Sequence, residues 1–143
     1  MPHLVILYTP QLDRECDMAA LCRRLADTML AQRDDEGRPV FPVGGTRVLA
    51  YPAAHHAVAD GSADAAFAYF QLRMARGRPE ALRRHIGEAL VAAAREQLAP
   101  LLATRALGLT LQVEEGAEGF DARFGNLHAL FPPQSAPGPG APA

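Results

Sequence analysis

The sequence contains no lysine, because all 14 of its basic residues are arginine. Amine chemistry, as a Schiff base or as a neutral general base, is therefore available only at the chain terminus. Arginine cannot supply it, since the guanidinium group stays protonated, but arginine holds a carboxylate well through two parallel hydrogen bonds. A lysine-free protein that binds a dicarboxylate has to use arginines for the acid groups. A GC-rich genome that encodes arginine in place of lysine is the alternative explanation, and the abundance of alanine, glycine and proline agrees with it.

Other absences narrow the class of protein. The net charge is −2 and no basic block is present, which argues against a nucleic-acid partner. No apolar run approaches the length of a membrane span, and the first residues lack the charged head and cleavage site of a signal peptide. Gly44-Gly45 lacks the lysine that follows the glycines of a phosphate-binding loop. We therefore expect a cytoplasmic protein that contacts neither nucleic acid nor membrane.

Cysteine and histidine give no sign of a metal or redox site. The two cysteines, Cys16 and Cys22, lie six residues apart in a predicted helix, on roughly opposite faces, and cannot pair there. We expect free thiols in the core. The five histidines show no spacing that suits a metal, and the adjacent His55 and His56 point to opposite faces of a strand. The sequence thus predicts no metal and no cofactor.

The first residues are the stretch around which the rest of the chain is organised. Residues 4–7 form an unbroken apolar run, which is typical of a short buried strand. Pro2 stands at the head of this strand, where its missing N–H costs no ladder hydrogen bond. If Met1 is removed, Pro2 becomes a secondary amine at the rim of the core, and burial lowers the pKa of an amine. A neutral amine near physiological pH is a general base, although Met-Pro is also an ordinary translation start.

The hydrophobic pattern along the chain predicts two consecutive strand–helix–strand units. Asp13 is a candidate cap for the first helix. The second helix opens at Pro79, and Pro100 is expected to kink or end it before helical structure resumes. The predicted elements are a strand at 4–7, a helix at 14–32, a polar turn at 33–39, strands at 46–56 and 65–74, a helix from 79 that closes at Gly108, a strand at 109–114, a loop at 116–124 and a short extended segment at 126–131.

This order indicates an α+β fold in which two pseudo-repeated βαβ units form a mixed sheet with two helices on one face. Residues 1–131 form a single domain, and the Pro/Gly/Ala-rich tail at 132–143 is expected to be disordered. The other face of the sheet stays open, and its apolar residues need a partner. Association into a closed ring satisfies this need.

Five blocks of the sequence stand in a particular order: Pro2-His3-Leu4-Val5-Ile6, Phe41-Pro42-Val43-Gly44-Gly45-Thr46-Arg47, Ala59-Asp60-Gly61, Gly77-Arg78 and Asn126-Leu127-His128-Ala129-Leu130-Phe131. No single block is specific, but the ordered set, over about residues 2–131, resembles the 5-carboxymethyl-2-hydroxymuconate Δ-isomerase family of the tautomerase superfamily. The resemblance implies a tautomerase-like fold and a homotrimer. It also implies a processed N-terminal proline that moves a proton between carbon atoms of a dicarboxylate dienol.

The resemblance assigns roles to four residues. Pro2 is the catalytic base, and Arg47 binds a substrate carboxylate or stabilises developing oxyanion charge. Gly44-Gly45, which precedes Arg47 with one residue between them, lets the backbone pass close to another group. Arg78, next to a helix N-terminus, and His3 are assigned to substrate binding. A surface salt bridge for Arg47 and a helix cap for Arg78 are the structural alternatives.

Two departures from the family pattern bear on the substrate. Leu49 stands where the better-known members have a second arginine, and this loss would change which diacid binds or whether one binds at all. Leu7 replaces an acidic residue, which would lower the pKa of the Pro2 amine further. The sequence therefore predicts an isomerase of an unsaturated 2-hydroxy dicarboxylate. The alternatives are a non-catalytic trimer that binds a small acid and a tautomerase of other 2-oxo or enol acids, such as arylpyruvates.

Overall fold

The computed structural model describes residues 1–116, 120 and 122–131. Four strands form one mixed sheet in the order β2-β1-β3-β4. β1 and β2 are parallel, β3 and β4 are parallel, and β1 and β3 are antiparallel. The predicted α+β fold of two βαβ units in one mixed sheet is therefore confirmed. The strands are β1 (His3–Tyr8), β2 (Arg47–Pro52), β3 (Ala66–Met74) and β4 (Leu107–Glu115).

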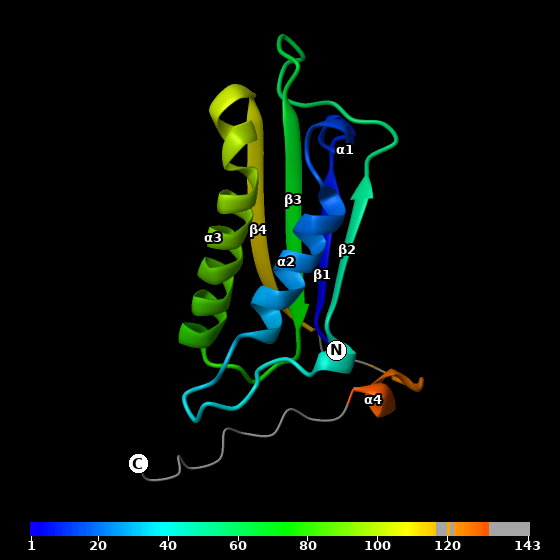
Figure 1. Ribbon diagram of the computed structural model, residues 1–143, viewed down its shortest axis with the longest axis vertical. Helices are drawn as coiled ribbons and strands as arrows, with labels where there is room; N and C mark the ends of the chain where they lie inside the picture. The colour runs from blue at the N-terminus through cyan, green and yellow to red at the C-terminus, as the bar shows by residue number, and fades with distance from the viewer. Residues whose placement is uncertain (117–119, 121, 132–143) are drawn as a thin grey trace.

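Two long helices, α2 (Met18–Leu30) and α3 (Glu80–Thr104), cover the same face of the sheet, as predicted (Figure 1). Successive side chains of a strand point to opposite faces, and every second side chain of β3 is buried under these helices. The apolar stripes of the helices close this layer. The largest fully buried side chains are Leu4, Ile6, Phe70 and Leu72 of the sheet, Leu21, Leu25 and Met29 of α2, and Ile86, Leu90 and Leu98 of α3.

The other face of the sheet carries exposed apolar side chains. Val5 pairs with Leu49 and Leu7 pairs with Tyr51, so the four side chains share this face. The exposed fractions of Leu7, Leu49 and Tyr51 are 48%, 44% and 50%. An apolar patch of this kind on one face marks a contact surface.

The first helix differs from the prediction. One helix at 14–32 capped by Asp13 is wrong, because the short helix α1 (Gln11–Glu15) ends first and α2 begins anew after Asp17. The Asp17 carboxylate accepts a hydrogen bond at 2.9 Å from the backbone N–H three residues further on, a capping bond that competes with helix continuation. Asp13 instead accepts a hydrogen bond from the Tyr8 hydroxyl.

The second helix also ends differently. α3 continues through Pro100 and ends at Thr104, so Gly108 does not close it but lies within β4. Pro100 is exposed in the last turns of α3, where the missing N–H costs one hydrogen bond. The Thr104 hydroxyl donates to the Pro100 carbonyl at 3.2 Å.

The outer strand and the C-terminal segment also depart from the prediction. The strand predicted at 46–56 ends earlier, at Pro52, on the outer strand of the sheet. The segment 126–131, predicted to be extended, contains the short helix α4 (Leu127–Leu130). The tail at 132–143 and part of the 116–124 loop lie outside the described residues. Within the described chain, no helix is both long and apolar enough to cross a membrane.

Candidate functional site

The candidate site lies at the end of the sheet where the chain begins. Pro2 is buried immediately before β1. His3 pairs with Arg47 of β2 on one side and with Arg73 of β3 on the other. Residues that pair directly across neighbouring strands direct their side chains to the same face. The start of β1 therefore brings an imidazole and two guanidinium groups to one face beside Pro2.

Arg47 reaches toward the chain terminus. Its Nη1 atom donates to the Gly45 carbonyl at 3.2 Å and lies 3.5 Å from the Met1 Sδ atom. The same sulfur lies 3.3 Å from Nε2 of His128. The Met1 side chain thus occupies the space that Arg47 and His128 both face, next to Pro2.

His128 has no role assigned from its sequence position. It lies on α4, which contacts the short 3-10 helix η1 (Val43–Gly45). A Cβ atom on Gly44 would lie 3.0 Å from the His128 Cα, and one on Gly45 would lie 3.4 Å from its Cε1. The two glycines therefore permit a close approach of another segment, as predicted from the sequence. The glycines alone could not indicate that this segment carries His128.

A hollow of about 460 Å³ adjoins the chain terminus. Met1, His3 and Arg73 line it, together with the exposed rings of Phe120 and Phe124. The volume lies within the range of pockets that hold small ligands. Met1 lines this hollow and also contacts Arg47 and His128. The Met1 side chain therefore lies between the hollow and these two residues.

Arg78 lies at the same end of the molecule but in another hollow. Its Nη2 atom donates to the Val40 carbonyl at 2.9 Å, so part of its function is to hold the segment before η1. Neither Pro2, His3 nor Arg47 lines the hollow of about 550 Å³ that Arg78 faces. The structure therefore brings three of the four predicted site residues together and leaves Arg78 apart from them.

Leu7 and Leu49 take different places relative to the site. Leu49 shares the open sheet face with Arg47, two residues before it on β2. Leu7 lies five residues beyond Pro2, about 17 Å along an extended strand. Leu7 is thus too far from the Pro2 nitrogen to lower its pKa by contact.

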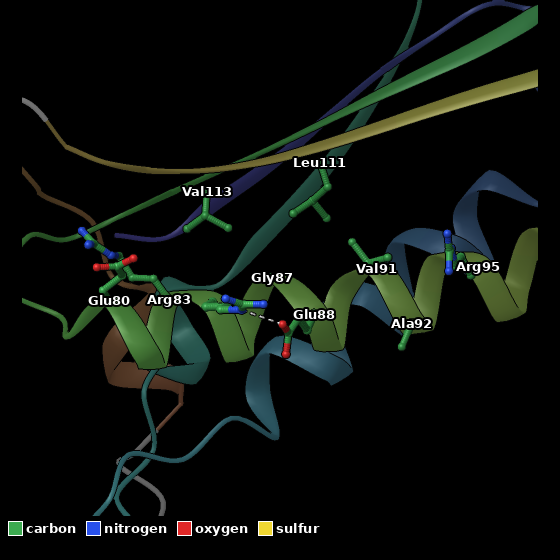
Figure 2. A pocket seen from close by; sticks show the side chains of 10 residues that line it. Glu80, Arg83, Gly87, Glu88, Val91, Ala92, Arg95, Leu111 and Val113 are labelled. Atoms are coloured by element: carbon green, nitrogen blue, oxygen red, sulfur yellow. Dashed lines mark hydrogen bonds and ion pairs between the residues drawn. The ribbon is translucent and has the colours of Figure 1, made fainter.

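A third hollow, of about 570 Å³, lies between α3 and β4 (Figure 2). Three arginines line it, and two of them already pair with carboxylates. Arg83 pairs with Glu115 at 2.9 Å, and Arg84 pairs with Glu88 at 2.9 Å. None of the four predicted site residues lines this hollow. It is therefore a weaker candidate for binding an acid than the chain-start region.

The structure gives no support to a metal or thiol site. In the part of the chain that is described, no three His, Cys, Asp or Glu side chains are arranged to hold a metal ion. Cys16 and Cys22 are unpaired thiols, partly buried against the core. Burial raises the pKa of both thiols, which disfavours the nucleophilic thiolate.

Known proteins are similar to this chain in sequence and in fold. The family model of 5-carboxymethyl-2-hydroxymuconate isomerase matches residues 2–131. The 5-carboxymethyl-2-hydroxymuconate Delta-isomerase of Escherichia coli is 28% identical over 131 residues, covering 92% of this chain and 99% of that protein. A crystal structure of a 5-carboxymethyl-2-hydroxymuconate delta-isomerase is 60% identical with a TM-score of 0.89, covering 94% of this chain and 95% of the other. The isomerase from Deinococcus radiodurans R1 is 32% identical with a TM-score of 0.79, covering 90% and 92%. These matches confirm the resemblance and the tautomerase-like fold.

Proposed function

Because the chain belongs to the 5-carboxymethyl-2-hydroxymuconate isomerase family and is an isomerase, we propose that it shifts a proton within an unsaturated 2-hydroxy dicarboxylate without a cofactor. Pro2 is the general base, Arg47 is the second catalytic residue, and His3 and Arg78 bind the substrate. One observation carries the proposal: Pro2 is buried at the head of β1, and the side chain before it, Met1, lies 3.5 Å from the Arg47 guanidinium.

The reaction needs a neutral amine at Pro2. Removal of Met1 converts the Pro2 nitrogen from an amide into a secondary amine, and burial lowers the pKa of that amine. The amine accepts the proton of the substrate enol hydroxyl and returns it to a carbon further along the conjugated chain. The O–H bond and one C=C π bond break, a C=O π bond and a C–H bond form, and the composition of the substrate does not change.

Arg47 stabilises the negative charge that develops on the enol oxygen. Its only acceptors among the described residues are the Gly45 carbonyl and the Met1 sulfur, so no carboxylate of that part of the chain neutralises it. A fixed guanidinium in a site with little water stabilises a developing oxyanion strongly. His3, between Arg47 and Arg73 on the same face, binds a carboxylate of the substrate. Arg78 would bind a carboxylate that reaches its separate hollow at the same end of the molecule.

The assembly is proposed to be a homotrimer. The open sheet face exposes Leu7, Leu49 and Tyr51, and a closed ring of three subunits buries such a face in every copy. Light scattering on the purified protein measures the mass directly. We expect a Leu7→Glu variant to shift the mass toward the monomer, whereas a monomeric wild type contradicts the proposal.

Two measurements test the role of Pro2. Intact-mass analysis of the mature protein is expected to show a chain that begins at Pro2. A Pro2→Ala variant is expected to lower kcat on a dicarboxylate dienol by about 10²-fold or more, because its terminal amine is no longer the fixed cyclic one. Retention of Met1, or undiminished turnover by the Pro2→Ala variant, would remove the amine from the mechanism.

A panel of substrates separates the remaining alternatives. Turnover of diacid enols above monoacid enols, such as those of arylpyruvates, is the expected result. Binding of a small acid without turnover of any enol would favour the non-catalytic reading. The cytoplasmic location stays a prediction from the sequence.

A further inference from the structure

We propose that Arg73 binds the substrate carboxylate remote from the reacting enol, in place of the arginine that the family pattern has at position 49. The inference rests on the proposed function, because it assigns a further residue to the same site. The site is then expected to prefer a diacid whose second carboxylate is directed toward β3 rather than along β2.

The guanidinium of Arg73 lacks the partner that its strand position offers. Glu114 of β4 is directly opposite Arg73 in the register, where opposite charges normally pair. Glu114 instead accepts a hydrogen bond from Gln71 Nε2 at 2.9 Å. Neighbouring Arg76 donates to the Gly116 carbonyl at 2.6 Å. With respect to the described residues, Arg73 alone of these two arginines keeps its side-chain donors available.

The spacing of the two arginines suits an extended diacid. Arg47 and Arg73 are the in-register neighbours of His3 on its two sides. Adjacent strands lie about 4.8 Å apart, so the two backbones are separated by about 10 Å across β1. A ligand whose enol oxygen lies at Arg47 and whose remote carboxylate lies at Arg73 would have its middle over the start of β1, beside Pro2.

The Met1 side chain occupies the middle of this path. Met1 lines the hollow of about 460 Å³ together with His3 and Arg73. Its sulfur also lies 3.5 Å from Arg47. The processing step that exposes the Pro2 amine therefore also connects the Arg47 side of the site with the Arg73 hollow. One cleavage creates the base and joins the position that binds the enol oxygen to the position that binds the remote carboxylate.

The position of Leu49 explains why a second arginine would be needed. Leu49 pairs with Val5 and is 44% exposed, so that part of β2 offers an apolar surface and no charge. Among the described strand residues that share this face near His3, Arg73 supplies the cation on the opposite side of β1 from Arg47. Arg73 of β3 thus supplies the positive charge that β2 lacks at position 49.

Arg73→Gln and Arg95→Gln form a matched pair of variants. Arg95 is exposed on α3, away from the chain start, and makes no ion pair with the described residues. We expect Arg73→Gln to raise KM for a dicarboxylate dienol by about 10- to 100-fold, since charge-assisted hydrogen bonds to a carboxylate are strong. KM for a monocarboxylate enol should change by less than about twofold. Arg95→Gln should change neither value, and Arg73→Lys should restore part of the loss.

Binding of adipate, a saturated diacid that cannot react, gives a readout independent of catalysis. Calorimetry should show weaker adipate binding to the Arg73→Gln variant and unchanged binding to Arg95→Gln. An equal loss for diacid and monoacid enols, or a selective loss for Arg78→Gln but not for Arg73→Gln, would overturn the inference. If the wild type turns over no enol yet adipate binding depends on Arg73, the proposed function fails and the Arg73 site stands.

Discussion

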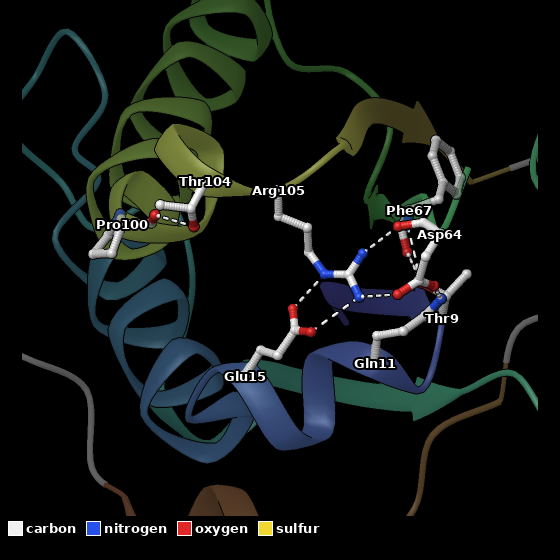
Figure 3. Close-up of polar contacts among 8 residues, drawn as sticks. All are labelled: Thr9, Gln11, Glu15, Asp64, Phe67, Pro100, Thr104 and Arg105. Carbon is white, nitrogen blue, oxygen red and sulfur yellow. Dashed lines mark hydrogen bonds and ion pairs between the residues drawn. The ribbon is translucent and has the colours of Figure 1, made fainter.

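The two ends of the sheet use arginine in opposite ways. Where β3 begins, Arg105 donates to both carboxylate oxygens of Glu15, to the Asp64 carbonyl at 2.5 Å and to the Asp64 carboxylate at 3.0 Å (Figure 3). Where β3 ends, Arg47 and Arg73 have no acidic partner among the residues that the structure describes. The first arginine is a structural link between segments, and the other two are available to an acid from outside.

The end of the sheet where Arg105 lies, the paired end, is held by a network of polar contacts among protein groups. The Arg105 side chain is only 11% exposed, and Asp64 also accepts a hydrogen bond from Gln11 Nε2 at 3.0 Å. The contacts join α1, the loop before β3 and the end of α3 (Figure 3). An arginine whose donors are saturated in this way gains nothing from a ligand carboxylate, whereas an unpaired one does. The difference in partners, and not the residue type, separates the two functions.

We expect the largest effect at the opposite end of the sheet, the open end, where Arg47 and Arg73 lie. Arg47→Gln removes the guanidinium that faces the reacting oxygen, so we expect kcat to fall by about 10²- to 10³-fold. The melting temperature should stay the same, because no acidic group of the described chain loses its partner. Steady-state kinetics and a thermal melt on the same preparation check both parts. A marked loss of stability would show that Arg47 is a structural residue like Arg105.

The next largest effect is expected on stability, where α4 packs on η1. Gly44→Ala places a methyl group 3.0 Å from the His128 Cα, so α4 has to move and we expect a loss of about 1–3 kcal/mol in the free energy of unfolding. Gly87→Ala is the control, since its Cβ would meet only side-chain atoms, of Val113 at 3.4 Å and of Leu111 at 3.9 Å. Denaturant melts compare the two variants. Equal stabilities would mean that α4 does not pack on η1 in solution.

The architecture was predictable from sequence, because alternation with a period of two and apolar stripes of helical period determine which faces are buried. The break before α2 was not predictable, because Asp13 and Asp17 are both acceptable N-cap residues and only the backbone conformation selects Asp17. α4 is four residues long, too short to show any period. Arg73 and Arg105 look alike in the sequence. Their difference depends on cross-strand register and on the loop before β3, which no local pattern encodes.

At the paired end, the expected effect is on stability alone. Arg105→Gln leaves Glu15 and Asp64 without their guanidinium, so the melting temperature should fall while kcat and KM for the dienol stay within about twofold of the wild-type values. Arg84→Gln is the matched control, because its partner Glu88 is one turn away on the exposed surface of α3. A loss of turnover without a loss of stability would place Arg105 in the active site and reverse the comparison.

The smallest effect is the pH dependence of stability. The Arg105 hydrogen bond lowers the pKa of Glu15, and hydrogen bonds from Gln11 and then Arg105 lower the pKa of Asp64. The stabilisation from these carboxylates is therefore complete above their unfolded pKa values of about 4.3 and 3.9 and is lost as the pH falls through the lower folded values. Below about pH 4, the free energy of unfolding should fall more steeply for the wild type than for Arg105→Gln.

Glu15 should account for most of the difference between the two curves, because Gln11 still donates to Asp64 in the variant. Asp34, whose pKa is lowered by hydrogen bonds within the 34–38 turn, contributes equally to both proteins and cancels in the comparison. Urea melts of both proteins between pH 7 and pH 3 measure the slopes. Parallel curves would show that the Arg105 network is not formed in solution, and the contrast between the two ends of the sheet would then rest on Arg47 and Arg73 alone.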